Sequence, residues 1–374
     1  MEIDSENHIN NQNQKDIQFK HGGNILSMAK KLNLLPSQII DSSASLVPFD
    51  PPKIILDALT LEIKTQGFRY YPERNLNHLK DIIGEFHKIN PARVLPGNGA
   101  SELITWAGYE ASKYGISSLP SPGFADYERS LKCWKANFTY SKLPKDLNNH
   151  FPQSFPLEPI CDVIWITNPH NPTGQLWDKD SLEKILNKYK LVICDEAFLA
   201  LTPNGEKHSL VPLTKNYNNL LVIRSLTKLF NIAGLRLGYV IGSPEKLRKW
   251  NIQRDPWPLN SFAIKAGIEL LRDKIFYEEW TKKIHDWIII EKALVFDQLS
   301  KIKNLKVHDS STNFFLIESE SSLSKNIEYL EKKGILIREC SSFKFLNEKW
   351  ARISLQSKKN NKILCRELQN SFKK

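Results

Sequence analysis

The sequence has few of the residues that cross-link a chain or bind metal ions. Its 374 residues include five cysteines, and no two of them form a C-x-x-C pair. They are Cys133, Cys161, Cys194, Cys340 and Cys365. An odd, scattered set in a chain of this length predicts free thiols in a reducing, cytoplasmic compartment. No metal-ligand spacing is visible, and we expect no metal site.

Long apolar runs are lacking as well. No run approaches the ~18 residues that a membrane helix needs. Residues 1–20 are polar and rich in asparagine, without the apolar core of a signal peptide. We therefore expect a soluble, cytoplasmic protein with a flexible polar leader at 1–20 and no membrane partner.

The charge is unbalanced, with 52 Lys and Arg against 41 Asp and Glu, a net +11. Such a surplus fits either a nucleic-acid-binding surface or a lysine-rich surface with no particular partner. The basic residues are spread along the whole chain, and no RNA-recognition, zinc-finger or basic-zipper pattern accompanies them. The second interpretation is favoured, so no nucleic-acid partner is expected.

Apolar and amphipathic segments alternate between residues 91 and 241. The expected strands cover 115–119, 138–141, 163–167, 191–195, 220–224 and 238–241, with helices at 101–113, 124–134 and 179–188 between several of them. This alternation predicts a mostly parallel sheet with helices on both faces.

The rest of the chain predicts a second, smaller unit. The length of the whole chain, 374 residues, also favours two units, because single cores rarely grow beyond roughly 250–300 residues. Further strands are expected at 305–307, 313–317, 335–338 and 351–355, and helices at 28–35, 323–333 and 358–371. We expect an N-terminal arm at 21–50, a large domain at 51–260, a connecting helical segment at 261–303, and a small α+β domain at 304–374 that includes the arm.

Two turns at the ends of expected strands have the composition of ligand-binding loops. Residues 97–102 read GNGASE just before a helix, where small residues let backbone N–H groups approach a phosphate. Residues 168–174 read NPHNPTG directly after the strand at 163–167, where two prolines restrict the backbone. Ligands of open α/β sheets bind beyond such strand ends, although either turn alone is also a common structural feature.

Charged residues follow two further strands. Asp195 ends the buried strand at 191–195, where a carboxylate needs a cationic partner. Lys228 lies in the sequence SLTK at 225–228, with Arg236 eight residues later. A desolvated ammonium near another cation has a lowered pKa and becomes a nucleophilic amine. A solvated lysine on a loop is the alternative.

Together and in this order, the four features resemble the fold-type I pyridoxal-phosphate enzymes of the class I/II aminotransferase family, from about residue 21 to the C-terminus. The resemblance implies the PLP-dependent transferase fold, in which a large domain with a mostly parallel central sheet flanked by helices carries a small α+β domain. It also implies pyridoxal 5'-phosphate as cofactor and a homodimer with shared active sites.

The resemblance further implies roles for individual residues. Lys228 would form the Schiff base with the cofactor and later move protons, Asp195 would pair with the pyridine nitrogen, and Asn171 would bond the ring O3′. Further cofactor contacts would come from Ala100, Ser101, Phe124 (on the ring face, unless it is a core aromatic), Ser225, Thr227 and Arg236, with Tyr71 from a second subunit. Arg352 would hold the substrate carboxylate.

Within the family, three segments resemble the threonine-phosphate decarboxylases of cobalamin biosynthesis, which convert O-phospho-L-threonine to aminopropanol phosphate and CO₂. They are HGGN at 21–24, DEAF at 195–198 and IRECS at 337–341. This implies a phosphorylated amino-acid substrate, with Arg338 and His21 as candidates for its phosphate. Histidinol-phosphate aminotransferases, which usually have Tyr at the Phe198 position, are the alternative. A basic nucleic-acid-binding protein built on an inactive enzyme fold is a more remote alternative function.

The sequence departs from the family pattern in two places. Ser45 and Val47 stand where relatives usually have asparagine, so that an amide donor expected near the substrate is missing. The segment ISLQ at 353–356, which ends in Gln356, lacks the second arginine that often follows the carboxylate clamp.

Overall fold

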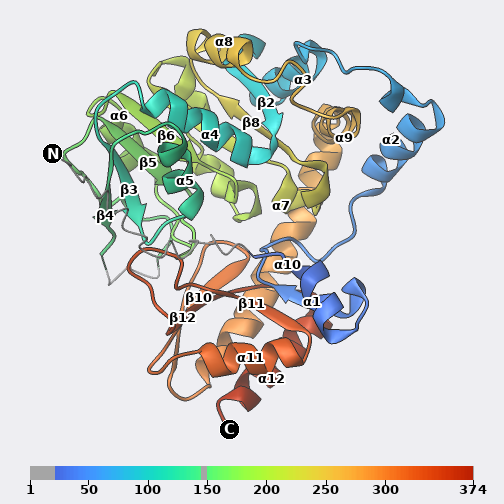
Figure 1. Ribbon diagram of the computed structural model, residues 1–374, viewed down its shortest axis with the longest axis vertical. Helices are drawn as coiled ribbons and strands as arrows, with labels where there is room; N and C mark the ends of the chain where they lie inside the picture. Colours follow the sequence, from blue (N-terminus) through green and yellow to red (C-terminus); the bar gives the residue numbers. More distant parts are fainter. Residues whose placement is uncertain (1–21, 145–149, 374) are drawn as a thin grey trace, which may run out of the picture.

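The computed structural model describes residues 22–144 and 150–373, which are organised around two β-sheets (Figure 1). The larger sheet has the strand order β2-β8-β7-β6-β5-β3-β4, and the smaller has the order β1-β11-β12-β10-β9. The strands are β1 (Ile40–Ser42), β2 (Val94–Asn98), β3 (Ser117–Ser121), β4 (Phe138–Lys142), β5 (Val163–Thr167), β6 (Leu191–Asp195), β7 (Leu220–Ser225), β8 (Leu237–Ile241), β9 (Leu305–His308), β10 (Phe314–Ser319), β11 (Ile335–Glu339) and β12 (Trp350–Ser354).

Helices cover both sheets and join them, with α10 running from the larger sheet toward the smaller one (Figure 1). The helices are α1 (Ile25–Leu32), α2 (Lys53–Lys64), α3 (Asn77–His87), α4 (Gly99–Ala111), α5 (Ala125–Cys133), α6 (Lys179–Leu186), α7 (Thr227–Phe230), α8 (Pro244–Gln253), α9 (Ser261–Arg272), α10 (Lys274–Ser300), α11 (Ser324–Lys332) and α12 (Lys358–Ser371).

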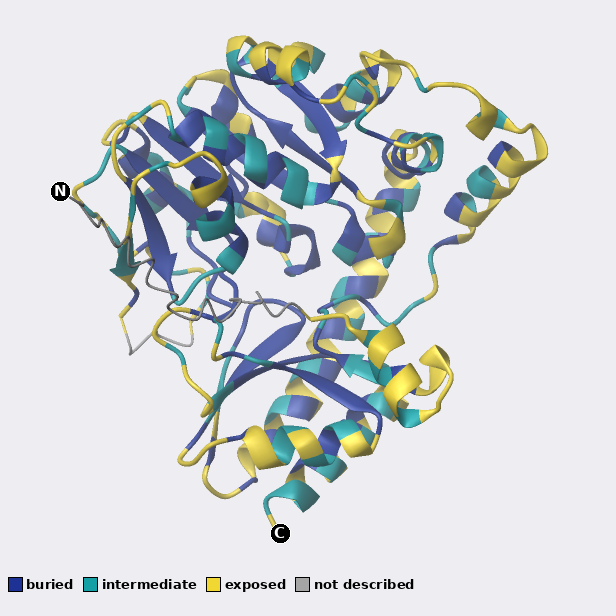
Figure 2. Cartoon of the chain, in the orientation of Figure 1, coloured by how far each residue is buried: buried dark blue, intermediate teal, exposed yellow. Residues whose placement is uncertain are grey.

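The inner strands of the larger sheet are buried on both faces and are among the darkest elements of Figure 2, whereas the edge strand β4 is partly exposed. In β5, Ile164 and Ile166 belong to one apolar cluster, whereas Val163 and Trp165 belong to another. Because successive side chains of a strand point to opposite faces, a sheet covered on both sides needs apolar residues at every position. The continuous apolar runs of the sequence are the consequence.

The larger sheet is mostly parallel, as predicted. β8 alone runs antiparallel to its neighbours, β2 and β7. The chain from the end of β7 at Ser225 to the start of β8 at Leu237 is short. A parallel return needs a crossover of about a dozen residues or more, usually with a full helix. The segment here carries only the one-turn helix α7, and the chain turns back antiparallel.

The sequence did not predict two of the strands. β2 contains Pro96 and Gly97, which break the usual strand pattern. It is nevertheless paired along its whole length with β8. β1 comes from the N-terminal segment and pairs in parallel with β11, so that residues far apart in the chain complete the smaller sheet.

One predicted helical segment is present as two helices, and one helix was predicted with the wrong bounds. The helical stretch expected at 261–303 consists of α9 and α10, separated by Asp273, whose side chain accepts a bond from Phe276 N at 2.9 Å and begins the second helix. Helix α1 ends at Asn33 in the left-handed conformation, before Pro36 is reached. The domain boundaries expected from the sequence stay a prediction.

In the described part of the chain, no helix is both long enough and apolar enough to cross a membrane. All five cysteines are free thiols.

Candidate active site

A cavity of about 430 Å³ opens at the carboxyl ends of β5, β6 and β7, between the two sheets. Both sheets and the N-terminal segment contribute to its wall. Its lining residues include Gly22, Gly23, Asp41, Ser43, Ala44, Ala100, Ser101, Phe124, Tyr127, Thr167, Asn171, Asp195, Phe198, Ser225, Thr227, Lys228, Arg236, Arg338, Phe343 and Arg352.

Lys228 lies in the middle of this wall, in the single turn of α7 that follows β7. Its Nζ donates a hydrogen bond to the carbonyl oxygen of Ala44 at 3.0 Å and lies 5.6 Å from the centre of the Phe198 ring. Burial, together with the positive charges of Arg352 and Arg236, lowers the pKa of Lys228 from 10.5 to about 8. A substantial fraction of this amine is therefore uncharged near neutral pH.

Asp195 ends β6 as a buried carboxylate. Its Oδ2 accepts a hydrogen bond from the Tyr127 hydroxyl at 2.8 Å, and its Oδ1 accepts one from Ala197 N at 3.0 Å. Both donors are uncharged. Burial raises the pKa of the Asp195 carboxyl, and the bond from Tyr127 opposes that shift. A bound cation would satisfy this carboxylate further.

Small residues and hydroxyl groups form a second corner of the cavity, around Arg236. Gly99 has a positive φ of 74°, and a Cβ atom there would lie 2.5 Å from Nη2 of Arg236. Glycine therefore lets the guanidinium approach the backbone at the start of α4. Ala100, Ser101, Ser225 and Thr227 line the cavity beside it. Backbone N–H groups at a helix N-terminus, hydroxyls and a guanidinium together form an anion site.

The side chain of Arg352 extends from β12 of the smaller sheet to the loop that follows β5 of the larger sheet. Its Nη1 donates to Oδ1 of Asn171 at 2.6 Å, and its Nη2 donates to the carbonyl oxygen of Ser43 at 2.8 Å. The guanidinium lies 4.9 Å from the centre of the Phe314 ring. Burial lowers the pKa of Arg352 to about 10, so it remains a cation at neutral pH.

Arg338 stands directly opposite Arg352 in the antiparallel pairing of β11 and β12. It is 8% exposed and is therefore not a surface arginine. Its Nη2 donates to Oγ of Ser342 at 2.7 Å, and its guanidinium lies 5.3 Å from the centre of the Phe343 ring. Two buried arginines from adjacent strands thus line one cavity.

The structure brings together nearly all of the predicted site residues. Tyr71 is the exception among those described, because it is 79% exposed and stacks on Trp257 with ring centroids 4.3 Å apart, outside this cavity. His21 lies outside the described residues. Within the described residues, no group of three or more His, Cys, Asp or Glu side chains could hold a metal ion.

The residues that depart from the family pattern serve the packing around the site. Ser45 has a φ of 51° and shares a 2.6 Å hydrogen bond with the hydroxyl of Ser354. Val47 is buried in the core. Gln356 donates to the carbonyl oxygen of Asp41 at 2.9 Å. The bonds of Ser45 and Gln356 tie the N-terminal segment to β12 and the chain after it, whereas Val47 N donates to the carbonyl oxygen of Lys228 at 3.4 Å.

Sequence reasoning missed several lining residues. Tyr127 lies one turn into α5, three residues after Phe124, and that spacing was the available signal. Thr167 ends β5, and its Oγ1 shares a 2.8 Å hydrogen bond with the Tyr127 hydroxyl. Gly22 and Gly23 belong to the HGGN segment that resembles the threonine-phosphate decarboxylases, but they were not assigned to the site. Phe343 carries no local signal, because only the tertiary fold brings it to the cavity.

The comparisons with known proteins agree with this geometry. Residues 37–368 match the model of the family described as aminotransferase class I and II. A threonine-phosphate decarboxylase of Salmonella typhimurium is 29% identical and covers 94% of this chain and 96% of its own. A histidinol-phosphate aminotransferase of Methanococcus aeolicus is 29% identical over 88% of both chains.

Among solved structures, the histidinol-phosphate aminotransferase from Clostridium acetobutylicum has a TM-score of 0.79 and 28% identity, covering 90% of this chain and 99% of its own. The fold predicted from the sequence is thereby confirmed. The chain belongs to the aminotransferase class I and II family.

Proposed function

We propose that the chain is a pyridoxal-phosphate enzyme that removes CO₂ from a phosphorylated amino acid, as a threonine-phosphate decarboxylase does. The observation that carries this proposal is the pair of buried arginines, Arg352 and Arg338, opposite each other in β12 and β11 and on the wall of one cavity. Two cations at one site suit a substrate with two anionic groups, a carboxylate and a phosphate.

Two features support a fit between these residues and the family's cofactor. The close approach of Arg236 to Gly99 makes a cradle for a phosphate, which Ser101, Ser225 and Thr227 complete. At the other end, the buried Asp195 carboxylate suits a protonated ring nitrogen. Asn171 and Phe124 would contact the ring between these ends. Bound pyridoxal phosphate supplies an electron-accepting ring that stabilises negative charge at the substrate Cα.

The substrate carboxylate has its own partner in Arg352. Its Nε is buried without a hydrogen-bond partner among the described residues, and such an atom is costly unless a ligand satisfies it. A carboxylate could accept bonds from this nitrogen and from an Nη in a fork. Arg338 would then take the phosphate. After CO₂ leaves, Lys228 in its protonated form would deliver the proton that takes the place of the carboxylate at Cα.

Transamination of a related phosphate ester is the second candidate. It is supported by sequence identity, because this chain is 29% identical to the Salmonella typhimurium decarboxylase and equally 29% identical to the Methanococcus aeolicus aminotransferase. Decarboxylation breaks the bond from Cα to the carboxylate, whereas transamination begins with loss of the Cα proton. The orientation in which Arg352 holds the carboxylate therefore separates the two reactions.

Product analysis with O-phosphothreonine labelled in its carboxyl group tests the proposal. We expect release of labelled CO₂ and formation of an amino-alcohol phosphate in repeated turnovers, with the cofactor recovered as pyridoxal phosphate. Stoichiometric conversion to the pyridoxamine form without CO₂ would instead establish the aminotransferase. Histidinol phosphate with 2-oxoglutarate is the matched substrate pair for that alternative.

The Arg338→Met variant tests the assignment of the phosphate. It should raise KM for O-phosphothreonine about tenfold or more, because a charge-assisted bond is lost. Cofactor affinity should stay unchanged, since Arg338 lies in the smaller sheet. An unchanged KM would remove Arg338 from the substrate site.

We further propose a cytoplasmic homodimer in which a second copy brings its Tyr71 to the phosphate corner. The high exposure of Tyr71 and its distance from the cavity of its own chain support this arrangement. Light scattering after gel filtration should give twice the chain mass. Mixing inactive Lys228→Ala and Tyr71→Ala chains should restore part of the activity, because one of the two sites in the mixed dimer would be intact.

A further inference from the structure

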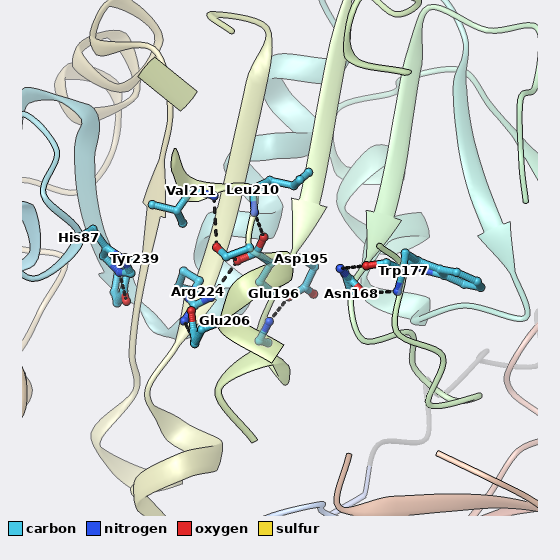
Figure 3. A network of polar contacts seen from close by, with 12 residues as sticks. His87, Asn168, Trp177, Asp195, Glu196, Glu206, Leu210, Val211, Arg224 and Tyr239 are labelled. Atoms are coloured by element: carbon cyan, nitrogen blue, oxygen red, sulfur yellow. Dashed lines mark hydrogen bonds and ion pairs between the residues drawn. The ribbon is translucent and has the colours of Figure 1, made fainter. Parts of the chain in front are cut away.

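A buried ion network lies behind the candidate active site, at the ends of β6 and β7 (Figure 3). Glu196 directly follows Asp195, and Arg224 directly precedes Ser225. Neighbouring residues of extended strands face opposite ways. Accordingly Asp195 and Ser225 line the cavity, whereas Glu196 and Arg224 are absent from its wall.

The network is well satisfied although it is almost completely buried. Arg224 is 3% exposed and Glu196 is 1% exposed. Arg224 Nη1 donates to Glu196 Oε2 at 2.8 Å, and its Nη2 forms an ion pair with the outer carboxylate of Glu206. Glu196 also accepts bonds from Ser209 Oγ and Leu210 N, both at 2.7 Å. Such complete bonding holds both side chains in a single arrangement.

The network joins the strands that carry the two ends of the cofactor site. Glu196 N donates to the carbonyl oxygen of Ile223 at 2.9 Å, which continues the pairing of β6 with β7. Arg224 stands opposite Tyr239 of β8, the strand that Arg236 precedes. If β6 slid against β7, the 2.8 Å bond would break and leave the buried Glu196 carboxylate without its cationic partner, which is strongly unfavourable.

We infer that Glu196 and Arg224 are positioning residues, whose ion pair sets the separation between the Asp195 carboxylate and the phosphate corner around Arg236. This inference rests on the proposed function. Pyridoxal phosphate is a rigid ring with an attached phosphate, so both ends bind well only if the two corners stand at the right separation. Binding geometry of this kind must be held within about 0.5 Å.

The double variant Glu196→Gln with Arg224→Met tests this inference. It removes both charges together, because removing Arg224 alone leaves the buried Glu196 carboxylate without a cationic partner. The affinity of the apoprotein is measured by equilibrium dialysis for pyridoxal phosphate, for pyridoxal and for inorganic phosphate. We expect pyridoxal phosphate to bind about tenfold more weakly, while pyridoxal and phosphate, which each occupy one end, stay within about twofold.

Glu206→Gln is the matched control, since it removes a carboxylate from the same arginine but leaves the bond between β6 and β7 in place. It should bind all three probes as the unchanged chain does. Equal weakening of all three probes in the double variant, or unchanged affinity for pyridoxal phosphate, would overturn the inference.

Two further outcomes are informative. If the double variant does not fold, as judged by thermal melting of the apoprotein, the single variant Glu196→Gln is measured with the same three probes and the same criteria. If the unchanged chain itself does not bind pyridoxal phosphate, the proposed function fails, and the positioning role fails with it.

Discussion

The lowered pKa of Lys228 predicts how the chain captures its cofactor as pH changes. Only the uncharged amine attacks the aldehyde of pyridoxal phosphate. Burial and the charges of Arg352 and Arg236 lower the pKa from 10.5 to about 8. The rate of capture should therefore rise with pH, because deprotonation produces the reactive form, and should level off above pH 8 rather than above pH 10.

The magnitude follows from the two pKa values. At pH 7 a lysine with a pKa of about 8 is uncharged in about one molecule in ten, whereas one with the ordinary value of 10.5 is uncharged in about one in three thousand. The fold therefore increases the uncharged, reactive fraction of this amine about 300-fold at this pH, and capture should be faster than with an exposed lysine.

Stopped-flow absorbance of the apoprotein mixed with pyridoxal phosphate, between pH 6 and pH 10, measures this rate. The cofactor phosphate ionises near pH 6, below the relevant range. Arg352→Gln should move the inflection upward, because it removes a neighbouring positive charge, whereas Arg352→Lys keeps that charge and should leave it nearly in place. A rate that still climbs beyond pH 9 in the unchanged chain would refute the argument.

Three further predictions concern single side chains. Lys228→Ala should abolish the visible absorbance of covalently bound cofactor while leaving the thermal melting of the apoprotein nearly unchanged; a persistent band would contradict the cofactor assignment. Tyr127→Phe removes a hydrogen-bond donor from Oδ2 of Asp195, at a cost of about 1–3 kcal/mol. Cofactor affinity, measured by dialysis, should therefore fall, and the pKa of the buried Asp195 carboxyl should rise further. Gly99→Ala places a Cβ 2.5 Å from the Arg236 guanidinium at a positive φ, and should weaken the binding of inorganic phosphate; equal binding would argue against a phosphate site there.

The sequence predicted those parts of the site that follow strand ends. Asp195, Lys228 and the loop with Asn171 each come directly after a buried apolar run, and parallel strands bring such positions to one edge of a sheet. Tyr127 was missed because a tyrosine in a helix has many ordinary roles. Its bond to Asp195 joins two elements that are far apart in the chain.

The smaller sheet shows where sequence reasoning ends. Its strands from β9 onward could be predicted from alternating apolar residues, but β1 is a three-residue strand from the N-terminal segment. It pairs with β11, almost 300 residues later in the chain. No local pattern predicts such a partner, because the pairing depends on the assembled surface and not on the strand's own composition.

The sequence by itself determined the class of fold and the identity of the reactive groups, since apolar periodicity and strand-end motifs are local properties of the chain. Only the tertiary structure decided that Arg338 and Arg352 are buried neighbours in one cavity, that the amine of Lys228 is partly uncharged near neutral pH, and that Glu196 and Arg224 join two strands behind the site. Burial, separation and electrostatic environment are set by residues distant in the chain, and they exist only once these residues are packed together.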